Sequence, residues 1–225
     1  AREHVAAGYR WVVDLDLEKF FDRVNQDKLM SLVKERITDR RVLQLIDRYL
    51  KAGALTGNGF EVTTEGTPQG GPLSPLFANL LLDGFDKELE RRGHRFVRYA
   101  DDSNIYVKSA RTGQRVLASV ARFLERRLKL TVNVAKSAVD RPWRRTFLGF
   151  TFTGRRPHRR QVSAKALQAL KQEVRQRTGR TRGVPLRRLV HDLRQYLDGW
   201  YAYFRVAEAQ SPFKELDSWV RRRLR

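Results

Sequence analysis

Two adjacent aspartates between two strand-like runs constrain this sequence more than any other feature. The segment FVRYADDSNIYVKS, residues 96–109, places Asp101 and Asp102 between the apolar runs RFVRYA and NIYVKS. Neighbouring side chains on a flat strand point to opposite faces, so both carboxylates can serve one site only from a tight turn. A turn with two carboxylates repels itself unless a cation neutralises it. The sequence therefore predicts an antiparallel hairpin whose acidic turn binds a cation.

A second acidic strand supplies further carboxylates. The run YRWVVDLDL, residues 9–17, alternates Val and Leu with Asp14 and Asp16, and Asp16 falls near the end of the predicted strand. Each acidic motif alone is better explained as a turn or a solvated strand edge. Together they suit Mg²⁺, which takes oxygen ligands and is shared with substrate phosphates. Because paired metal ions can stabilise the attacking and leaving oxygens of a phosphoryl displacement, the residues indicate nucleotidyl transfer.

The charge of the chain is uneven and indicates a polyanionic partner. The formal net charge is +21, and residues 141–225 contain 22 Lys and Arg against 6 Asp and Glu, whereas residues 1–140 contain 24 against 19. Aromatic residues and predicted helices are interspersed with the Arg, so a nucleic acid is the expected partner. A solvated, arginine-rich surface is the alternative.

Composition also excludes several classes of protein. The chain has no cysteine, which rules out disulfides, thiolate zinc sites and thiol nucleophiles. No apolar run approaches the roughly 20 residues that span a bilayer, and the first residues lack a signal-peptide pattern. We therefore expect an intracellular protein without a membrane segment.

The hydrophobic pattern predicts an α+β domain to about residue 154 and a basic helical segment after it. In the first part, helices are predicted over 26–37, 39–53, 75–93 and 112–130, with Asp39 as N-cap and Gly53 past the end of the second. The motif GNGF signals a hairpin, and residues 145–154 a strand or hairpin. Beyond the break GRRPHRR, only helices are predicted: 164–177 capped by Ser163, 185–207 opened by Pro185, and 211–225.

Five motifs occur in a fixed order along the chain: DLEKFFD, GTPQGGPLSPLFANLLL, RYADD, LTVNVAKS and TFLGF. This series resembles the palm of reverse transcriptases, most closely the bacterial group II intron type. The run LRQYLDGWYAYFRV, with FKELDSWVRRRLR after it, resembles the maturase-specific thumb domain of the same proteins. The resemblance covers nearly all of the chain. It implies a polymerase palm, an antiparallel sheet with packed helices, over 1–154, and a basic all-helical thumb or maturase domain over 155–225.

The resemblance also assigns metal ligands. Asp16 and Asp101 would hold two Mg²⁺ ions, with Asp102 as the flanking carboxylate. The backbone carbonyl of Leu17 would be a further metal ligand. Asp14 would be structural, because the family's spacing to the following aromatic residue selects Asp16.

Other motif residues would contact nucleotide, template and primer. Phe21 would be the aromatic gate that excludes the 2′-hydroxyl of a ribonucleotide. The loop by the incoming nucleotide and template would contain Pro68, Gln69 and Gly70, where Gly70 and Gly71 permit close backbone approach and Gln69 supplies an amide. Lys136 would lie near the departing pyrophosphate. The primer grip would consist of Phe147, Leu148 and Gly149.

By this resemblance the protein is expected to be an RNA-directed DNA polymerase with a maturase role. It would add deoxynucleoside triphosphates to a DNA or RNA primer on an RNA template, and would bind intron RNA and assist its splicing. We expect it in the bacterial cytoplasm, in a ribonucleoprotein particle. One alternative is an inactive palm serving as scaffold in an RNA-binding splicing cofactor. A remoter one is a palm-type nucleotide cyclase, against which the TPQGGP loop and the basic helices argue.

The start of the sequence bears on the first alternative. Only fifteen residues precede Asp16, where the family carries a fingers region that clamps the incoming triphosphate. Three explanations are open: the sequence is a fragment, the fingers come from elsewhere, or the chain does not polymerise.

Overall fold

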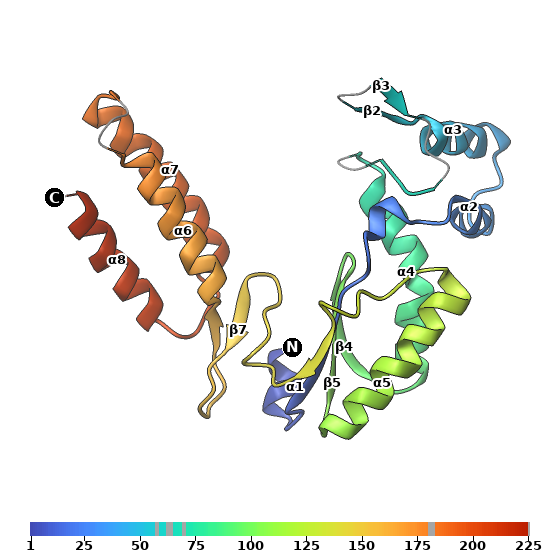
Figure 1. Cartoon of the computed structure of the whole chain (residues 1–225), viewed down its shortest axis with the longest axis horizontal. Coiled ribbons are helices and arrows are strands. Elements are labelled where there is room, and N and C mark those ends of the chain that lie inside the picture. Colours follow the sequence, from blue (N-terminus) through green and yellow to red (C-terminus); the bar gives the residue numbers. More distant parts are fainter. Residues whose placement is uncertain (57–58, 62–64, 69–70, 180–182, 225) are drawn as a thin grey trace. The chain divides into compact units, whose positions relative to one another are not determined.

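The structure, a computed structural model, describes residues 1–56, 59–61, 65–68, 71–179 and 183–224. It divides into two compact units (Figure 1). The first unit consists of Ala1 and Ala7–Asp140, and the second of Arg2–Ala6 and Arg141–Arg225. The domain division predicted at residue 154 falls inside the second unit.

A four-stranded antiparallel sheet organises the first unit. Its strand order is β4-β5-β1-β6. The strands are β1 (Trp11–Leu15), β4 (Arg95–Tyr99), β5 (Asp102–Val107) and β6 (Ala138–Asp140). In the register of β1 and β5, Val13 is opposite Ile105 and Trp11 is opposite Val107. Because side chains alternate along a strand, these apolar residues share one face, which confirms the predicted antiparallel sheet.

Helices α4 (Ser74–Arg91) and α5 (Ala110–Phe123) cover that apolar face and form the core with it (Figure 1). Leu81, Leu82 and Phe85 of α4 are almost completely buried there. Burying side chains of this size contributes about 1.5–3 kcal/mol each. These side chains hold the sheet from the helix-covered side, and Val12 and Tyr106 are buried on its opposite side.

The remaining elements of the first unit are the 3-10 helix η1 (Phe20–Asp22), α2 (Gln26–Lys34), α3 (Arg40–Lys51), the hairpin strands β2 (Ala54–Thr56) and β3 (Gly59–Glu61), and the π-helix η2 (Leu124–Leu128). Of these, α2 and α3 lie within predicted helices, whereas η1 and the π-helical form of η2 were not predicted. Asp39 caps α3 as predicted, since its Oδ1 accepts from the Arg41 amide at 2.7 Å. Gly53 follows α3 with φ of 72°, a conformation that suits glycine after a helix.

The second unit contains a short hairpin and four helices among its described residues. They are α1 (Arg2–Ala6), β7 (Phe150–Phe152), β8 (Arg160–Val162), α6 (Ala164–Arg177), α7 (Leu186–Phe204) and α8 (Ser211–Leu224). Ser163 caps α6 as predicted by accepting from the Ala166 amide. Strand β8 lies where the pattern predicts only helices. Its three residues are too few for alternation to be recognised, and pairing with β7 determines their conformation.

Small apolar clusters hold the helices of the second unit together. Leu170 and Val174 of α6 pack with Leu193 of α7 and Leu216 of α8, and Figure 1 shows α6 beside α7. Within the described residues of the whole chain, no helix is both long enough and apolar enough to cross a bilayer.

Candidate active site

The register of the sheet brings the predicted carboxylates together. Leu15 pairs with Ser103 across β1 and β5, so one step further Asp16 comes opposite Asp102. On the other side of the hairpin, Tyr99 pairs with Asp102. This leaves a two-residue turn, Ala100 and Asp101, so Asp101 lies in the turn as predicted, whereas Asp102 is the first residue of β5.

These carboxylates lie on the face of the sheet opposite the core. Asp14 and Asp16 alternate with Val13 and Leu15, and the latter two are buried against the helices. Asp14 pairs with Asn104, so Asn104 and Asp102 share this face, which we call the open face because its end at Asp102 is exposed. Asn104, Val12 and Tyr106 are buried on the same face, so its acidic part is the end that carries Asp14, Asp16 and Asp102.

Asp14 is engaged within the sheet. When the Asn104 amide is turned so that its nitrogen faces Asp14, it donates to Asp14 Oδ1 at 2.8 Å. Tyr106 lies further along the same face of β5, and burial raises its pKa to about 12. Asp14 therefore has a local partner, in keeping with the structural role expected for it.

The backbone of Asp16 is fixed by a segment distant in sequence. Its amide donates to Ser137 Oγ at 3.0 Å, and its carbonyl accepts from the Asn133 amide at 2.9 Å. Asn133 and Ser137 belong to the LTVNVAKS motif, but their contacts to Asp16 were not predicted from the sequence. These bonds hold Asp16 just beyond the end of β1.

One oxygen of the Asp16 carboxylate has no hydrogen-bond donor among the described residues. This oxygen, Oδ2, is buried. Lys136 Nζ lies 4.0 Å from this oxygen, and the Lys136 side chain is 72% exposed. A buried carboxylate oxygen costs free energy unless a cation or a donor reaches it. Lys136, which the resemblance assigns to the departing pyrophosphate, thus lies beside Asp16 in the structure.

Burial and neighbouring negative charges raise the pKa of Asp102. Partial burial is the largest cause, and the negative charges of Asp101, Asp14 and Asp16 add to it. Part of the Asp102 side chain is still exposed, so solvent screens this repulsion. A cation bound among these groups would remove the repulsion.

The donor set suits a divalent cation that keeps other ligands. Within the described residues, no three acidic or histidine side chains converge closely enough to hold a metal by themselves. Mg²⁺ is commonly held by one or two carboxylates, with waters and substrate phosphates as the other ligands. The buried Oδ2 of Asp16 and the repulsion at Asp102 fit such an ion. Leu17, the proposed carbonyl ligand, is buried and forms a β-bridge with Val132.

The predicted aromatic gate is tied to the predicted nucleotide loop. Phe21 is partly buried, packs edge-to-face on Phe20, and its carbonyl accepts from the Thr67 amide at 2.7 Å. Gly66 precedes that contact with φ of 85°, and a Cβ there would lie 2.8 Å from the Phe21 carbonyl oxygen. Only glycine allows this close approach. The segment Gly66-Thr67-Pro68 therefore fixes the backbone of Phe21.

The rest of the nucleotide loop is only partly described. Gln69 and Gly70 lie outside the described residues. The Pro68 carbonyl accepts from Ser74 Oγ at 2.5 Å, which joins the loop to the start of α4. A Cβ on Gly71 would meet the Tyr49 hydroxyl at 1.9 Å, so close packing requires glycine here as the motif suggests.

The predicted primer grip is a tight turn in the second unit. Phe147 and Phe150 exchange backbone hydrogen bonds of 2.9 and 3.0 Å, and both intervening residues, Leu148 and Gly149, have positive φ. This is the conformation of a two-residue hairpin turn. The Leu148 carbonyl accepts from the Tyr203 hydroxyl at 3.1 Å, which ties the turn to α7.

Comparison with known proteins identifies the family. The family model described as "Reverse transcriptase (RNA-dependent DNA polymerase)" matches residues 2–152. The model described as "Group II intron, maturase-specific domain" matches residues 167–225. Protein YkfC of Escherichia coli K12 is 30% identical over 181 residues, which cover 65% of this chain and 46% of that protein. Group II intron-encoded protein LtrA of Lactococcus lactis subsp. cremoris is 41% identical over 91 residues, 40% of this chain and 15% of LtrA.

The solved structures show the same fold at low identity. Telomerase from Candida albicans, in complex with a fragment of telomeric RNA, aligns with a TM-score of 0.56 at 13% identity. The alignment covers 96% of this chain and 43% of that one. The chain spans less than half the length of the curated relatives named above. The resemblance inferred from the five motifs is thereby confirmed: the chain belongs to the reverse transcriptase family and carries the maturase-specific domain of group II intron proteins.

Proposed function

We propose that this protein is an RNA-directed DNA polymerase of the group II intron type that uses two Mg²⁺ ions. The observation that carries the proposal is the pairing of β1 with β5 up to Leu15 and Ser103, since continuing this register by one residue would bring Asp16 opposite Asp102. Membership of the reverse transcriptase family supports the same reaction. In this assignment residues 1–154 form the palm and residues 155–225 the thumb, or maturase, domain.

In the proposed reaction the primer 3′-oxygen bonds to the α-phosphorus of a deoxynucleoside triphosphate. The bond from that phosphorus to the β-phosphate oxygen breaks, pyrophosphate leaves, and the 3′-hydroxyl proton passes to solvent. Bound Mg²⁺ lowers the pKa of the attacking hydroxyl and neutralises charge on the leaving group. Asp16 and Asp101 would hold the ions together with the Leu17 carbonyl, and Asp102 would add negative charge beside them.

The other motif residues orient the reactants in this proposal. Phe21 blocks the 2′-hydroxyl of a ribonucleotide, and its backbone bond to Thr67 keeps the ring in place. Lys136 neutralises phosphate charge near Asp16. The nucleotide and template lie along Pro68, Gln69 and Gly70, and the primer end along Phe147, Leu148 and Gly149.

We further propose that the basic second unit binds RNA, both the template–primer duplex and the intron RNA. The maturase-specific match over residues 167–225 and the excess of Arg beyond residue 141 support this. A protein that works on intron RNA would reside in a cytoplasmic ribonucleoprotein particle. Because phosphate contacts release counterions, the affinity should fall steeply with salt.

Primer extension on an RNA template with Mg²⁺ tests the polymerase, with Asp101→Ala as the control. Extension that is lost in the variant is the expected result. Filter binding to RNA at several salt concentrations is measured in parallel. Tight, salt-sensitive binding without extension would instead favour the RNA-binding splicing cofactor, and absence of both would refute the two functions.

A further inference from the structure

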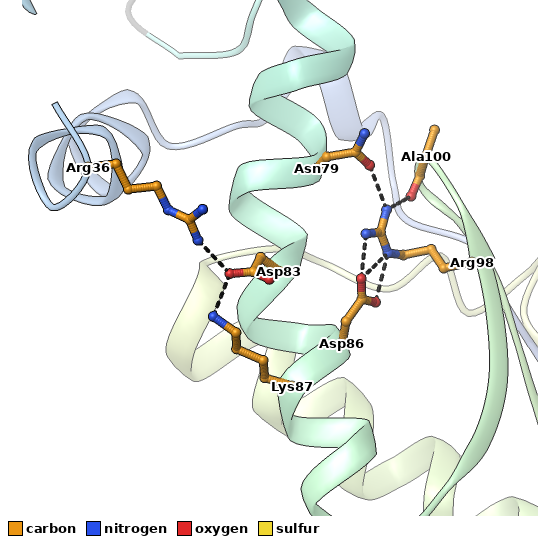
Figure 2. Close-up of polar contacts among 7 residues, drawn as sticks. All are labelled: Arg36, Asn79, Asp83, Asp86, Lys87, Arg98 and Ala100. Atoms are coloured by element: carbon orange, nitrogen blue, oxygen red, sulfur yellow. Dashed lines mark hydrogen bonds and ion pairs between the residues drawn. The ribbon is translucent and has the colours of Figure 1, made fainter.

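We propose that Arg98 is a positioning residue that holds the acidic turn from the helix-covered side of the sheet. Arg98 stands on β4, two residues before the turn, and contacts α4 and the turn at once (Figure 2). The proposal rests on the proposed function, because it explains how the carboxylates of that site are kept in place. Arg98 itself touches no reacting group.

The guanidinium of Arg98 uses all three of its nitrogens. Nε and Nη2 donate to the carboxylate of Asp86 on α4, at 2.8 Å to Oδ1 and 2.5 Å to Oδ2. Nη1 donates to Asn79 Oδ1 at 3.0 Å and to the Ala100 carbonyl at 2.8 Å. A planar fork of this kind combines a bidentate ion pair with two further directed bonds, which the single ammonium of lysine cannot reproduce.

The strand register shows why Arg98 acts from behind the site. Arg98 pairs with Ser103, which is buried on the core face, whereas Tyr99 pairs with Asp102 on the open face. Adjacent residues on a strand face opposite sides, so Arg98 points toward α4 and Asp102 away from it. The Arg98 side chain is only 11% exposed. A charge buried to this degree needs the partners it has.

The bond to Ala100 acts on the turn geometry directly. Ala100 has φ of 51°, in the left-handed region that non-glycine residues seldom occupy. Its carbonyl belongs to the planar peptide that leads into Asp101, so fixing that oxygen fixes the orientation of the Asp101 amide. Arg98 thus joins a rigid helix to the one peptide that sets the direction of Asp101.

A second ion pair on the same helix provides a matched control. Arg36 Nη2 donates to Asp83 Oδ2 at 2.8 Å, and Lys87 shares that carboxylate (Figure 2). The side chains of Arg36 and Asp83 are 58% and 37% exposed, against 11% and 24% for Arg98 and Asp86. Both pairs join an arginine to an aspartate of α4, but only that of Arg98 extends to the acidic turn.

The test compares Arg98→Lys with Arg36→Lys, and Asp86→Asn with Asp83→Asn, in the full chain. Amide hydrogen exchange is measured at Asp101 and Asp102, with Ile105 and Tyr106 of β5 as internal references. We expect the turn amides to exchange about threefold to tenfold faster in Arg98→Lys and Asp86→Asn. The exchange rates of Ile105 and Tyr106 should equal those of wild type in every variant. The turn amides of Arg36→Lys and Asp83→Asn should also exchange at the wild-type rate. Asp86→Asn keeps the experiment decisive if Arg98→Lys does not fold.

The second measurement has two parts. Mn²⁺ affinity is determined from the electron paramagnetic resonance signal of the free ion, and activity is determined by primer extension. Loss of a group that orients a metal ligand commonly lowers metal affinity or activity about 10- to 100-fold. We therefore expect Mn²⁺ affinity to fall by about tenfold in Arg98→Lys and to be unchanged in Arg36→Lys.

The two measurements separate the possible failures. If the turn amides of Arg98→Lys exchange at the wild-type rate, or if Arg36→Lys shows the same acceleration, Arg98 does not position the turn. If Arg98→Lys accelerates exchange but leaves Mn²⁺ affinity and extension unchanged, the bond is structural only and the proposal is overturned. If wild type neither binds Mn²⁺ nor extends a primer, the proposed function fails, and exchange alone decides whether Arg98 holds the turn.

Discussion

The two faces of the four-stranded sheet are built for opposite purposes. One face presents Val13, Leu15 and Ile105, which are almost fully buried against α4 and α5. The other presents Asp14, Asp16 and Asp102, whose like charges contribute to the raised pKa of Asp102. Neighbouring residues at this end of β1 therefore have opposite effects, since Leu15 is buried in the core and Asp14 and Asp16 add like charges. The difference teaches that the acidic end of the open face depends on the apolar face for its stability.

The largest effect should come from removing one carboxylate of the open face. Asp16→Asn keeps the shape of the side chain and removes the charge that would hold a metal ion. Because metal ions supply several kcal/mol of transition-state stabilisation, we expect primer extension to fall by about 10³-fold. The rate of single-turnover primer extension at saturating Mg²⁺ measures this loss of activity.

The stability of Asp16→Asn is the necessary control. The free energy of unfolding in the absence of metal should be equal to or above that of wild type, because the variant removes a like charge from the cluster. A strongly destabilised variant would mean that Asp16 supports the fold, and the contrast between the two faces would not hold.

Leu15 is the residue next to Asp16, and Leu15→Ala should lower stability while leaving extension by folded protein largely intact. Leu15 is 1% exposed, so truncation leaves a cavity in the core and should destabilise the unit by about 2–5 kcal/mol. Urea unfolding measures this loss. Extension per folded molecule should stay within a few fold of wild type at low temperature. A loss of extension as large as that of Asp16→Asn in fully folded protein would show that the faces are not separable.

Gly66 sharpens the comparison because it serves fold and site together. Gly66→Ala adds a Cβ that would lie 2.7 Å from the Asp22 carbonyl oxygen and 2.8 Å from that of Phe21. We expect it to cost roughly 1–3 kcal/mol more than Gly8→Ala, in thermal or urea unfolding. Displacing Phe21 should also raise incorporation of ribonucleotides relative to deoxynucleotides.

Gly8 is the matched control for this prediction. It has φ of 88°, close to the 85° of Gly66, but a Cβ added there would meet nothing within 4 Å. Gly8→Ala therefore carries only the backbone strain, about 1–2 kcal/mol. Equal losses in the two variants would show that the contact with the Phe21 and Asp22 carbonyls is not what requires glycine at residue 66.

The local features of the first unit were predictable because they depend on nearby residues. The hairpin with its acidic turn follows from two apolar runs around Asp101 and Asp102, and the α3 cap from Asp39 alone. The contacts that support the site were not predictable in this way. Arg98 meets Asp86 only because the register turns it toward α4, and Ser137 meets Asp16 across 121 residues of sequence.

A charged residue within an apolar strand was the one signal available for Arg98. In RFVRY it shares a strand face with Phe96, which packs against the core, and an arginine on that face needs a carboxylate partner. The sequence does not say which of the several acidic residues of α4 that partner is. Helix phase and strand register decide it together, and both require the tertiary structure.

The smallest effect is expected from Asp102→Asn. The pKa of Asp102 is raised from its ordinary 3.8, so the folded state favours the protonated carboxyl. The associated stability is present below pH 3.8 and is lost as the pH rises through the raised folded value. At pH 7 without metal, the variant should therefore unfold at a higher urea concentration than wild type. Since the side chain is partly exposed, the gain should be below about 1 kcal/mol.

Acidification and Mg²⁺ should each remove this gain, for different reasons. Toward pH 4 the wild-type carboxyl becomes protonated, so the two proteins should converge in stability. At pH 7, Mg²⁺ should stabilise wild type more than the variant, because an ion bound at the acidic face stabilises only the folded state. If Asp102→Asn is less stable than wild type at pH 7 in a metal chelator, the open face is not repulsive. The two faces would then differ in polarity alone, and metal binding would relieve no repulsion between the carboxylates.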